Sequence, residues 1–123
     1  SVEFTLMFAL LLVIGTVSAG PTCEWLGNGP LCGSPDCPLG MIEVHRMSIG
    51  NSDKIAHFGI DCWWGLQKTL CCKKDAIRPD FRKHCALARE KECPPGTEQL
   101  YFEITDEHRW GKPTCCKVGS VFT

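Results

Sequence analysis

The chain has 123 residues, of which 13 are lysine or arginine and 14 are aspartate or glutamate, so its formal net charge is −1. A protein so close to neutral has no general electrostatic attraction to nucleic acids or to anionic membranes. This balance weighs against a DNA-binding protein or a cationic pore-former, and we expect neither a nucleic-acid partner nor insertion into a membrane.

The N-terminal segment predicts secretion. Residues 4–14 read FTLMFALLLVI, and the small and polar residues GTVSAG follow. This apolar run is too short to span a bilayer, and no other segment is long enough, whereas Val17 and Ala19 fit a signal-peptidase site. We therefore expect a signal peptide over residues 1–19, cleavage after Ala19 and a secreted, extracellular mature protein. A buried N-terminal helix is the alternative.

All ten cysteines lie in the 104 residues after the predicted cleavage site. A cysteine content near one residue in ten is typical of a small secreted protein held together by disulfide bonds. No Cys-x-x-Cys sequence occurs, so the usual spacings of a redox dithiol or a zinc ribbon are missing. The cysteines expected to form disulfide bonds are Cys23, Cys32, Cys37, Cys62, Cys71, Cys72, Cys85, Cys93, Cys115 and Cys116.

The sequence contains a partial internal repeat. CPLG at residues 37–40 and CPPG at residues 93–96 share the form Cys-Pro-x-Gly, and each is followed downstream by Cys-Cys-Lys. The first unit carries six cysteines and the second carries four, so each unit can close its own bridges. We predict two disulfide-stapled modules, residues 20–75 and 79–118, joined by a short hinge. The alternative is one domain with bridges between the halves.

Several segments have the residue pattern of a strand or a helix. Residues 41–47 (MIEVHRM) alternate like a half-buried strand, and residues 66–73 are expected to close the first module as a strand. Residues 80–92 have apolar residues at helical spacing, so we expect a helix there. Residues 99–105 (QLYFEIT) form the strongest predicted strand, and residues 114–118 are expected to close the second module. The expected fold is small, disulfide-rich and mainly β, with one short helix and two stapled β-hairpin-like modules.

Cys71 and Cys72 are neighbours in the sequence. A bridge between neighbours would close a strained small ring, so each of these cysteines needs a distant partner. Successive side chains of a strand point to opposite faces of the sheet. We therefore expect one of the two to bind the core layer and the other to bind a loop on the opposite face, while the full connectivity stays open.

Four tryptophans are many for a chain of this size with one tyrosine. An indole can stack on a sugar ring or anchor a protein partner, and it can also fill a core that has few aliphatic side chains. We expect Trp25 in the core. Trp63 and Trp64 would point to opposite faces of an extended strand, so we expect one to be buried and one to be exposed. The candidate binding residues are Trp63, Trp64 and Trp110.

The sequence has no recognisable catalytic constellation. It lacks a GxSxG motif, a phosphate-binding loop and a dinucleotide fingerprint, and its four histidines do not have the spacing of metal ligands. Glu98, Glu103, Asp106 and Glu107 could supply paired carboxylates for glycoside hydrolysis, but so small a module leaves little room for a cleft. We therefore predict a protein that is not an enzyme and uses no cofactor or metal ion.

Charge is distributed unevenly along the chain. Residues 68–91 contain eight basic and three acidic residues, whereas residues 92–107 contain five acidic residues and no basic ones. Either the two segments neutralise each other within the molecule, or a basic face with Arg82, Lys83 and Arg89 meets an anionic glycan or an acidic partner.

Residues 23–40 (CEWLGNGPLCGSPDCPLG) and 58–74 (FGIDCWWGLQKTLCCKK) resemble a small secreted cysteine-rich module with the pattern C-x-W-x-G-x-x-P-x-C…C-P-x-G…G-x-x-C-x-x-G-x-K-x-x-C-C. This module is found in secreted nematode proteins and, in fungi, appended to chitinases. The resemblance covers under half of the chain; Gly29 replaces the usual alanine, and one extra residue separates Gly65 from Lys68. It implies secretion and a disulfide fold, and its association with chitinases points to polysaccharide surfaces. The matching positions are Cys23, Trp25, Gly27, Pro30, Cys32, Cys37, Pro38, Gly40, Gly59, Cys62, Gly65, Lys68, Cys71 and Cys72.

Together these features predict a secreted, non-enzymatic binding module whose ligand is an extracellular glycan or protein. The alternative is a secreted toxin, a defence peptide or a protease inhibitor. In that case we expect the activity to lie on a loop such as residues 48–58 (SIGNSDKIAHF) and not on the tryptophans.

Overall fold

The computed structural model describes residues 22–50, 55–63 and 65–123, so the predicted signal peptide, residues 1–19, lies outside the described residues. The secondary-structure elements of the described part are β1 (Cys23–Leu26), β2 (Met41–Met47), β3 (Lys68–Lys73), the 3₁₀ helices η1 (Lys74–Ala76) and η2 (Phe81–His84), β4 (Cys85–Leu87), β5 (Thr97–Glu103) and β6 (Lys112–Lys117). The predicted fold class, small, disulfide-rich and mainly β, is confirmed. None of the helices in these described segments has the length and apolar character needed to cross a membrane.

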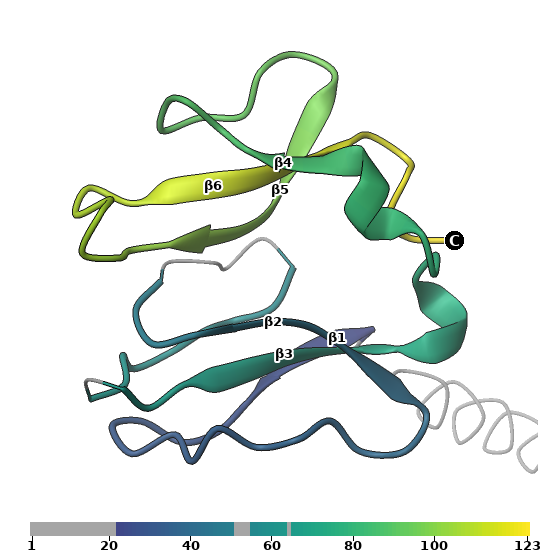
Figure 1. The fold of residues 1–123 in the computed structure, drawn as a ribbon. Coiled ribbons are helices and arrows are strands. Elements are labelled where there is room, and N and C mark those ends of the chain that lie inside the picture. The colour runs from purple at the N-terminus through teal and green to yellow at the C-terminus, as the bar shows by residue number, and fades with distance from the viewer. Residues whose placement is uncertain (1–21, 51–54, 64) are drawn as a thin grey trace, which may run out of the picture.

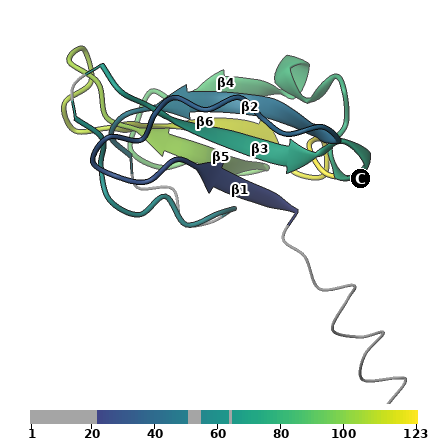
Figure 2. The ribbon, with the colours of Figure 1, turned by 90° about the horizontal axis from the view of Figure 1, so that it is seen from below.

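The strands form two three-stranded antiparallel sheets, with the orders β1-β3-β2 and β4-β6-β5. The sheets lie one above the other as two layers (Figure 1). β1 and β5 run along one side of this sandwich, and β2 and β4 run along the other side (Figure 2). Each sheet buries its inner face against the other, which is the usual solution for two small sheets that are apolar on one side.

The internal repeat extends to the register of the strands. Cys23 of β1 lies opposite Cys72 of β3, and Cys85 of β4 lies opposite Cys116 of β6. A register shift also occurs at corresponding points of β2 and β5. β1, β2 and β3 of the first sheet therefore correspond to β4, β5 and β6 of the second, residue by residue.

The four predicted strands are confirmed, with differences at their ends. Residues 41–47 form β2 with the expected bounds, whereas the strands predicted over residues 66–73, 99–105 and 114–118 are β3, β5 and β6 with shifted ends. The sequence did not predict β1 and β4, which have four and three residues. Segments this short hold too little alternation to indicate a strand, and pairing with the central strand defines them instead.

The helix predicted over residues 80–92 is wrong over most of its length. A single 3₁₀ turn, Phe81–His84, is followed directly by β4. Cys85 both pairs with Cys116 in the sheet and forms a disulfide bond with it, with 4.0 Å between their Cα atoms. The chain must be extended at that point to make both contacts, so tertiary pairing overrides the local helical preference.

The ten cysteines form five disulfide bonds, each of which closes within residues 23–72 or within residues 85–116. The bridges are Cys23–Cys72, Cys32–Cys62, Cys37–Cys71, Cys85–Cys116 and Cys93–Cys115. Cys72 belongs to the core between the sheets, and Cys71 binds the Cys-Pro-x-Gly segment on the opposite face. The prediction that these neighbours serve opposite faces is confirmed, and the second sheet repeats the arrangement.

The hydrophobic core lies between the sheets and draws on both of them. Leu70 from β3 and Leu100 from β5 belong to the same buried cluster. Trp25 is only 9% exposed and meets Phe58 edge to face, with 5.0 Å between the ring centroids. The predicted core position of Trp25 is therefore confirmed, and its ring supplies much of the apolar area beneath β1.

A polar contact also joins the two sheets. The rings of His45 in β2 and Tyr101 in β5 stack with 4.0 Å between their centroids and 3° between their planes. His45 Nε2 lies 3.0 Å from Glu103 Oε1, at the end of β5. His45 and Tyr101 hold corresponding positions in the two sheets, opposite Leu70 and Thr114, so equivalent parts of the two halves meet at this stack.

Candidate functional site

The predicted binding tryptophans lie on connections between strands. Trp63 is 62% exposed and Trp110 is 82% exposed, whereas Trp64 lies outside the described residues. Trp63 is therefore an exposed member of the neighbouring pair, and the structure does not describe the other member. Two largely exposed indoles leave a large apolar area in contact with water, which marks these connections as candidate contact surfaces.

Several contacts fix the backbone around Trp63. Trp63 N donates a hydrogen bond to Pro30 O at 2.8 Å, and Leu66 N donates to Trp63 O at 3.0 Å. The preceding residue, Cys62, forms a disulfide bond with Cys32. The indole of Trp63 therefore extends from a loop that is held both by hydrogen bonds and by a covalent cross-link.

Trp110 lies in the tight connection between β5 and β6. Thr105 and His108 exchange backbone hydrogen bonds, and Gly111 N donates to His108 O at 2.9 Å. Gly111 has a φ of +81°, and a Cβ atom at this position would collide with the ring of Phe102. Only glycine therefore fits directly after Trp110 without displacing the Phe102 ring.

A cleft of about 460 Å³ lies between the loop that carries Trp63 and the turn that carries Trp110. Gly65 lines it from the first of these connections, and Arg109 lines it from the second. The two indoles lie beside the cleft and do not line it, and Trp110 lines a separate hollow of about 280 Å³ formed by its own turn. Both connections lie at the same end of the sandwich, where β5 ends and β3 and β6 begin (Figures 1 and 2). We call this region the loop end.

Polar groups line the cleft at the loop end. The hydroxyl of Ser48 donates to Leu66 O at 2.6 Å, and the carboxylate of Glu103 is held by His45. Arg109 adds a guanidinium group with several hydrogen-bond donors. A fixed carboxylate, a hydroxyl and a guanidinium can pair with the hydroxyl groups of a sugar, while exposed indoles can stack on its apolar ring face.

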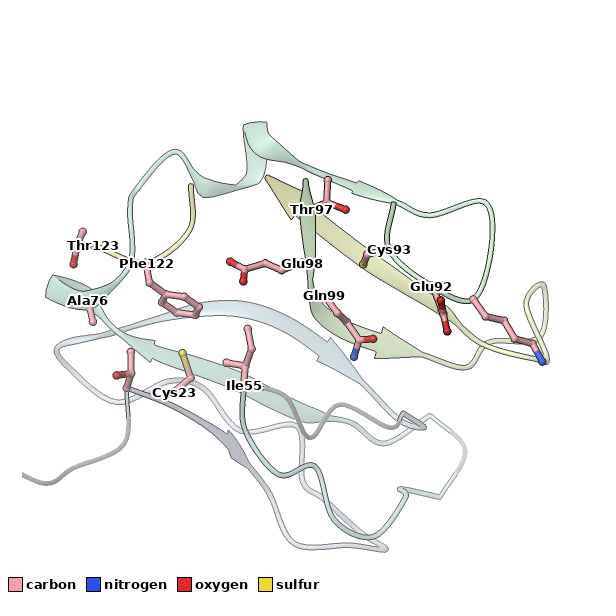
Figure 3. A pocket seen from close by; sticks show the side chains of 12 residues that line it. Cys23, Ile55, Ala76, Glu92, Cys93, Thr97, Glu98, Gln99, Phe122 and Thr123 are labelled. Atoms are coloured by element: carbon pink, nitrogen blue, oxygen red, sulfur yellow. The ribbon is translucent and has the colours of Figure 1, made fainter. Parts of the chain in front are cut away.

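A second and larger hollow, of about 790 Å³, opens between the sheets on the side of β1 and β5 (Figure 3). We call it the β1–β5 groove. Cys23, Ile55 and Phe122 contribute apolar surface to it. The side chain of Glu98 extends into the space between the sheets (Figure 3), because Glu98 lies opposite Cys116, whose side chain belongs to the core. A carboxylate thus faces a partly apolar groove.

Lys68 is a buried basic residue whose contacts fix a loop to β3. Its side chain is only 4% exposed, and Nζ donates a hydrogen bond to Phe58 O at 2.5 Å. Nζ also lies 4.5 Å from the centroid of the Phe58 ring. Burial lowers the pKa of Lys68 below its usual value, and this effect is partly opposed by the charge of Asp61. The lysine fastens the loop before Cys62 to the first residue of β3.

The other reactive groups are spread over the molecule. All ten cysteines are in disulfide bonds, so none is free to act as a thiolate nucleophile. Within the residues that the structure describes, no group of three or more His, Cys, Asp or Glu side chains is placed to hold a metal ion. Of the four carboxylates considered for glycoside hydrolysis, Glu98 lines the β1–β5 groove, whereas Glu103 and Asp106 line the cleft at the loop end and Glu107 lies in the turn before Trp110.

The alternative of a basic face with Arg82, Lys83 and Arg89 cannot rest on one helix, because the helical turn stops at His84. Lys83 and Arg89 are exposed, but Arg82 folds back onto the neighbouring sheet. Its Nη2 donates to Glu43 O at 3.0 Å, and its Cζ lies 4.9 Å from the centroid of the Phe81 ring.

Sequence reasoning missed the β1–β5 groove and the inward direction of Glu98. The predicted strand began at Gln99, one residue too late to include Glu98. Extending the alternation by one residue would have put this carboxylate on the inner face with Leu100. No protein-family model, curated protein or solved structure matches this chain, so its function has to be inferred from its own residues and geometry.

Proposed function

We propose that this protein is a secreted, non-enzymatic binding module that recognises an extracellular glycan at its loop end. The observation that carries the proposal is the exposure of Trp63 and Trp110 on two connections that flank one cleft. Aromatic rings stack on the apolar faces of sugars, and the polar groups of the cleft offer partners for sugar hydroxyls.

The disulfide scaffold supports this proposal in two ways. Five disulfide bonds in so short a chain are typical of extracellular proteins, and the predicted signal peptide over residues 1–19 agrees with secretion. The bridge between Cys32 and Cys62 also restrains the loop that carries Trp63 before any ligand binds. A restrained binding surface loses less conformational entropy on binding, which favours affinity.

The resemblance of residues 23–72 to secreted cysteine-rich modules, which rests on the sequence pattern alone, is a second reason for this proposal. Such modules occur beside chitinases in fungi, so a polymer of N-acetylglucosamine is the first glycan to test. The pattern includes Cys32 and Cys62, the cysteines whose bridge restrains the loop next to Trp63.

The alternative of an inhibitory or toxic loop over residues 48–58 would place its contact segment near residues 51–54, which lie outside the described residues. Ile49 O accepts a hydrogen bond from Ile104 N at 3.0 Å, Gly50 forms a β-bridge with Glu103, and Phe58 is buried. These contacts anchor the two described ends of the loop, so a loop-borne activity stands as the second proposal.

Titration of the purified protein with chitohexaose tests the proposal, and retention on insoluble chitin and cellulose extends the test to polymers. We expect Trp63→Ala and Trp110→Ala each to weaken binding by about tenfold, or roughly 1.4 kcal/mol, as for the loss of an aromatic anchor. Trp64→Ala belongs in the same series because the sequence marks it as a candidate.

Leu39→Ala is the matched control for these tryptophan variants. Leu39 is also a fully exposed apolar residue, but it lies before β2, at the other end of the first sheet from the loop that carries Trp63. Its replacement should leave glycan binding unchanged. Two results would overturn the proposal: unchanged glycan binding in all three tryptophan variants, or failure of the wild-type protein to bind every one of the glycans tested.

A further inference from the structure

The correspondence between the two sheets makes the two sides of the sandwich comparable. β1 corresponds to β4, and β2 corresponds to β5. If each strand is replaced by its counterpart, β2 becomes β5 and β4 becomes β1. The side formed by β2 and β4 is therefore the counterpart of the side formed by β5 and β1. Figure 2 shows the two sides along opposite margins of the sandwich. What fills one side therefore indicates what fits the other.

The side of β2 and β4 is filled by the chain itself. Phe81 in η2 is buried in the core between the sheets, and the next residue, Arg82, reaches across to β2. Its guanidinium donates to the backbone carbonyl of Glu43 at 3.0 Å and lies over the Phe81 ring. An apolar residue followed by an arginine thus closes this side.

On the side of β1 and β5, the part of the chain that the structure describes leaves the β1–β5 groove at the corresponding place. Glu43 lies opposite Cys71 in the first sheet, and Gln99 lies opposite Cys115 in the second, so Gln99 O is the counterpart of the carbonyl that Arg82 binds. Gln99 lines the β1–β5 groove of about 790 Å³, whereas the hollow beside Arg82 has only about 240 Å³.

The residue beside Gln99 adds a charge that the closed side lacks. Glu98 lies opposite Cys116, and its counterpart opposite Cys72 is Ile42. Where the filled side has an apolar residue on its inner face, the open side therefore has a carboxylate. Glu92 and Lys91 also line the groove, so its charged lining residues are two carboxylates and one ammonium group and keep a negative balance. Charge complementarity thus favours a cationic occupant.

We propose that the β1–β5 groove binds an extended segment of a partner protein through an arginine side chain. The guanidinium donates to Gln99 O, as that of Arg82 does to Glu43 O, and to the carboxylate of Glu98. A guanidinium has five donors in a planar fork and can serve a carbonyl and a carboxylate together, which the ammonium of a lysine does less well.

The groove also suits the backbone of such a segment. β1 and β5 are edge strands of their sheets, and the outer edge of β5 pairs with Gly50 at its last residue, Glu103, which leaves the part near Glu98 and Gln99 for a partner. An extended peptide that lies along an edge strand can hydrogen-bond to its free backbone groups, and its alternate side chains then enter the adjoining pocket. Ile55 and Phe122 offer apolar surface for the residue next to the arginine.

The segment that closes the opposite side supplies a defined probe. The acetylated and amidated peptide RPDFRKH, residues 78–84 of this chain, is titrated into the isotope-labelled protein and followed by amide chemical shifts. We expect the shift changes to centre on Glu98, Gln99 and Phe122. The same peptide with alanine in place of the arginine that follows phenylalanine should bind about tenfold or more weakly, because a hydrogen bond between charged groups is lost.

Glu98→Gln tests the contribution of the protein, with Glu24→Gln as its control. Glu24 is an exposed carboxylate on β1, and it points away from the groove because its neighbours Cys23 and Trp25 face the core. We expect Glu98→Gln to weaken peptide binding by about tenfold or more, whereas Glu24→Gln should have no effect. An unchanged amide spectrum elsewhere in each variant establishes that the fold is intact.

Four results would overturn this proposal. They are the absence of shift changes in the groove at millimolar peptide, equal binding of the alanine peptide, equal binding by Glu98→Gln, and groove shifts produced by chitohexaose in place of the peptide. Trp63→Ala should leave peptide binding intact, so failure of the glycan proposal at the loop end is distinguishable from failure here.

Discussion

At the scale of single residues, Lys68 shows how a buried charge can hold a loop in place. Its Nζ donates to Phe58 O, in the loop before Cys62. Replacement of Lys68 by methionine keeps the stem but leaves the Phe58 carbonyl without this donor. We expect Lys68→Met to lower the free energy of unfolding by about 1–3 kcal/mol, measured by urea denaturation with the disulfide bonds intact.

Lys73→Met is the control for this substitution. Lys73 is the exposed last residue of β3, and its replacement should change the free energy of unfolding by less than about 0.5 kcal/mol. Equal stability of Lys68→Met and the wild type would show that the buried hydrogen bond does not stabilise the loop.

The same lysine makes the free energy of unfolding depend on pH in the alkaline range. Burial lowers the pKa of Lys68 in the folded protein below the usual value of 10.5, because the charged form loses hydration. Between the folded and the unfolded pKa, the unfolded chain binds more protons at this site than the folded chain does. The stability contributed by the group therefore rises with pH through this interval and is lost as the pH falls through the folded pKa.

Urea denaturation of the wild type and of Lys68→Met at a series of pH values measures this effect. The free energy of unfolding of the wild type minus that of the variant should grow as the pH is raised toward 10.5. A difference that stays constant or decreases over this range would contradict the assigned pKa direction.

At the scale of elements, alternation and covalent chemistry predicted most of the fold. The pattern of residues 41–47 predicted β2 with its observed bounds, and the strand direction at Cys71 and Cys72 predicted their opposite partners. Both features follow from the two-residue period of a strand, which is a local property and is visible in one sequence.

Features that depend on distant contacts could not be predicted in the same way. The extended conformation at Cys85 depends on its pairing with Cys116, and the spacing from Phe81 onward favoured a helix instead. The cleft at the loop end depends on two connections about forty residues apart in the sequence, which meet because the sheets stack. Exposed tryptophans were expected, but the cleft between the two connections that carry Trp63 and Trp110 was visible only in three dimensions.

At the scale of the whole molecule, the two sheets stabilise each other through one core. Leu70 and Leu100 come from different sheets and belong to the same buried cluster. Leu70→Ala and Leu100→Ala should each lower the free energy of unfolding by about 2–5 kcal/mol, the usual range for large-to-small core substitutions. Because the core is shared, amides of both sheets should lose hydrogen-exchange protection together in either variant.

This measurement also tests the predicted division into two modules, residues 20–75 and 79–118. Loss of protection confined to the substituted sheet would indicate that each module is stable alone. Loss in both sheets would indicate one cooperative unit in which each half requires the inner face of the other.

The pairing of the cysteines leaves the two halves of the chain free to exchange between two molecules. No disulfide bond joins the sequence before η1 to the sequence after η2, so only the backbone between β3 and β4 connects the halves covalently. The first half of one chain can therefore pack on the second half of another chain with the same contacts, once the connection extends. Three cross-links in the first half and two in the second thus stabilise the halves and still permit a domain-swapped dimer to form without reduction of any bond.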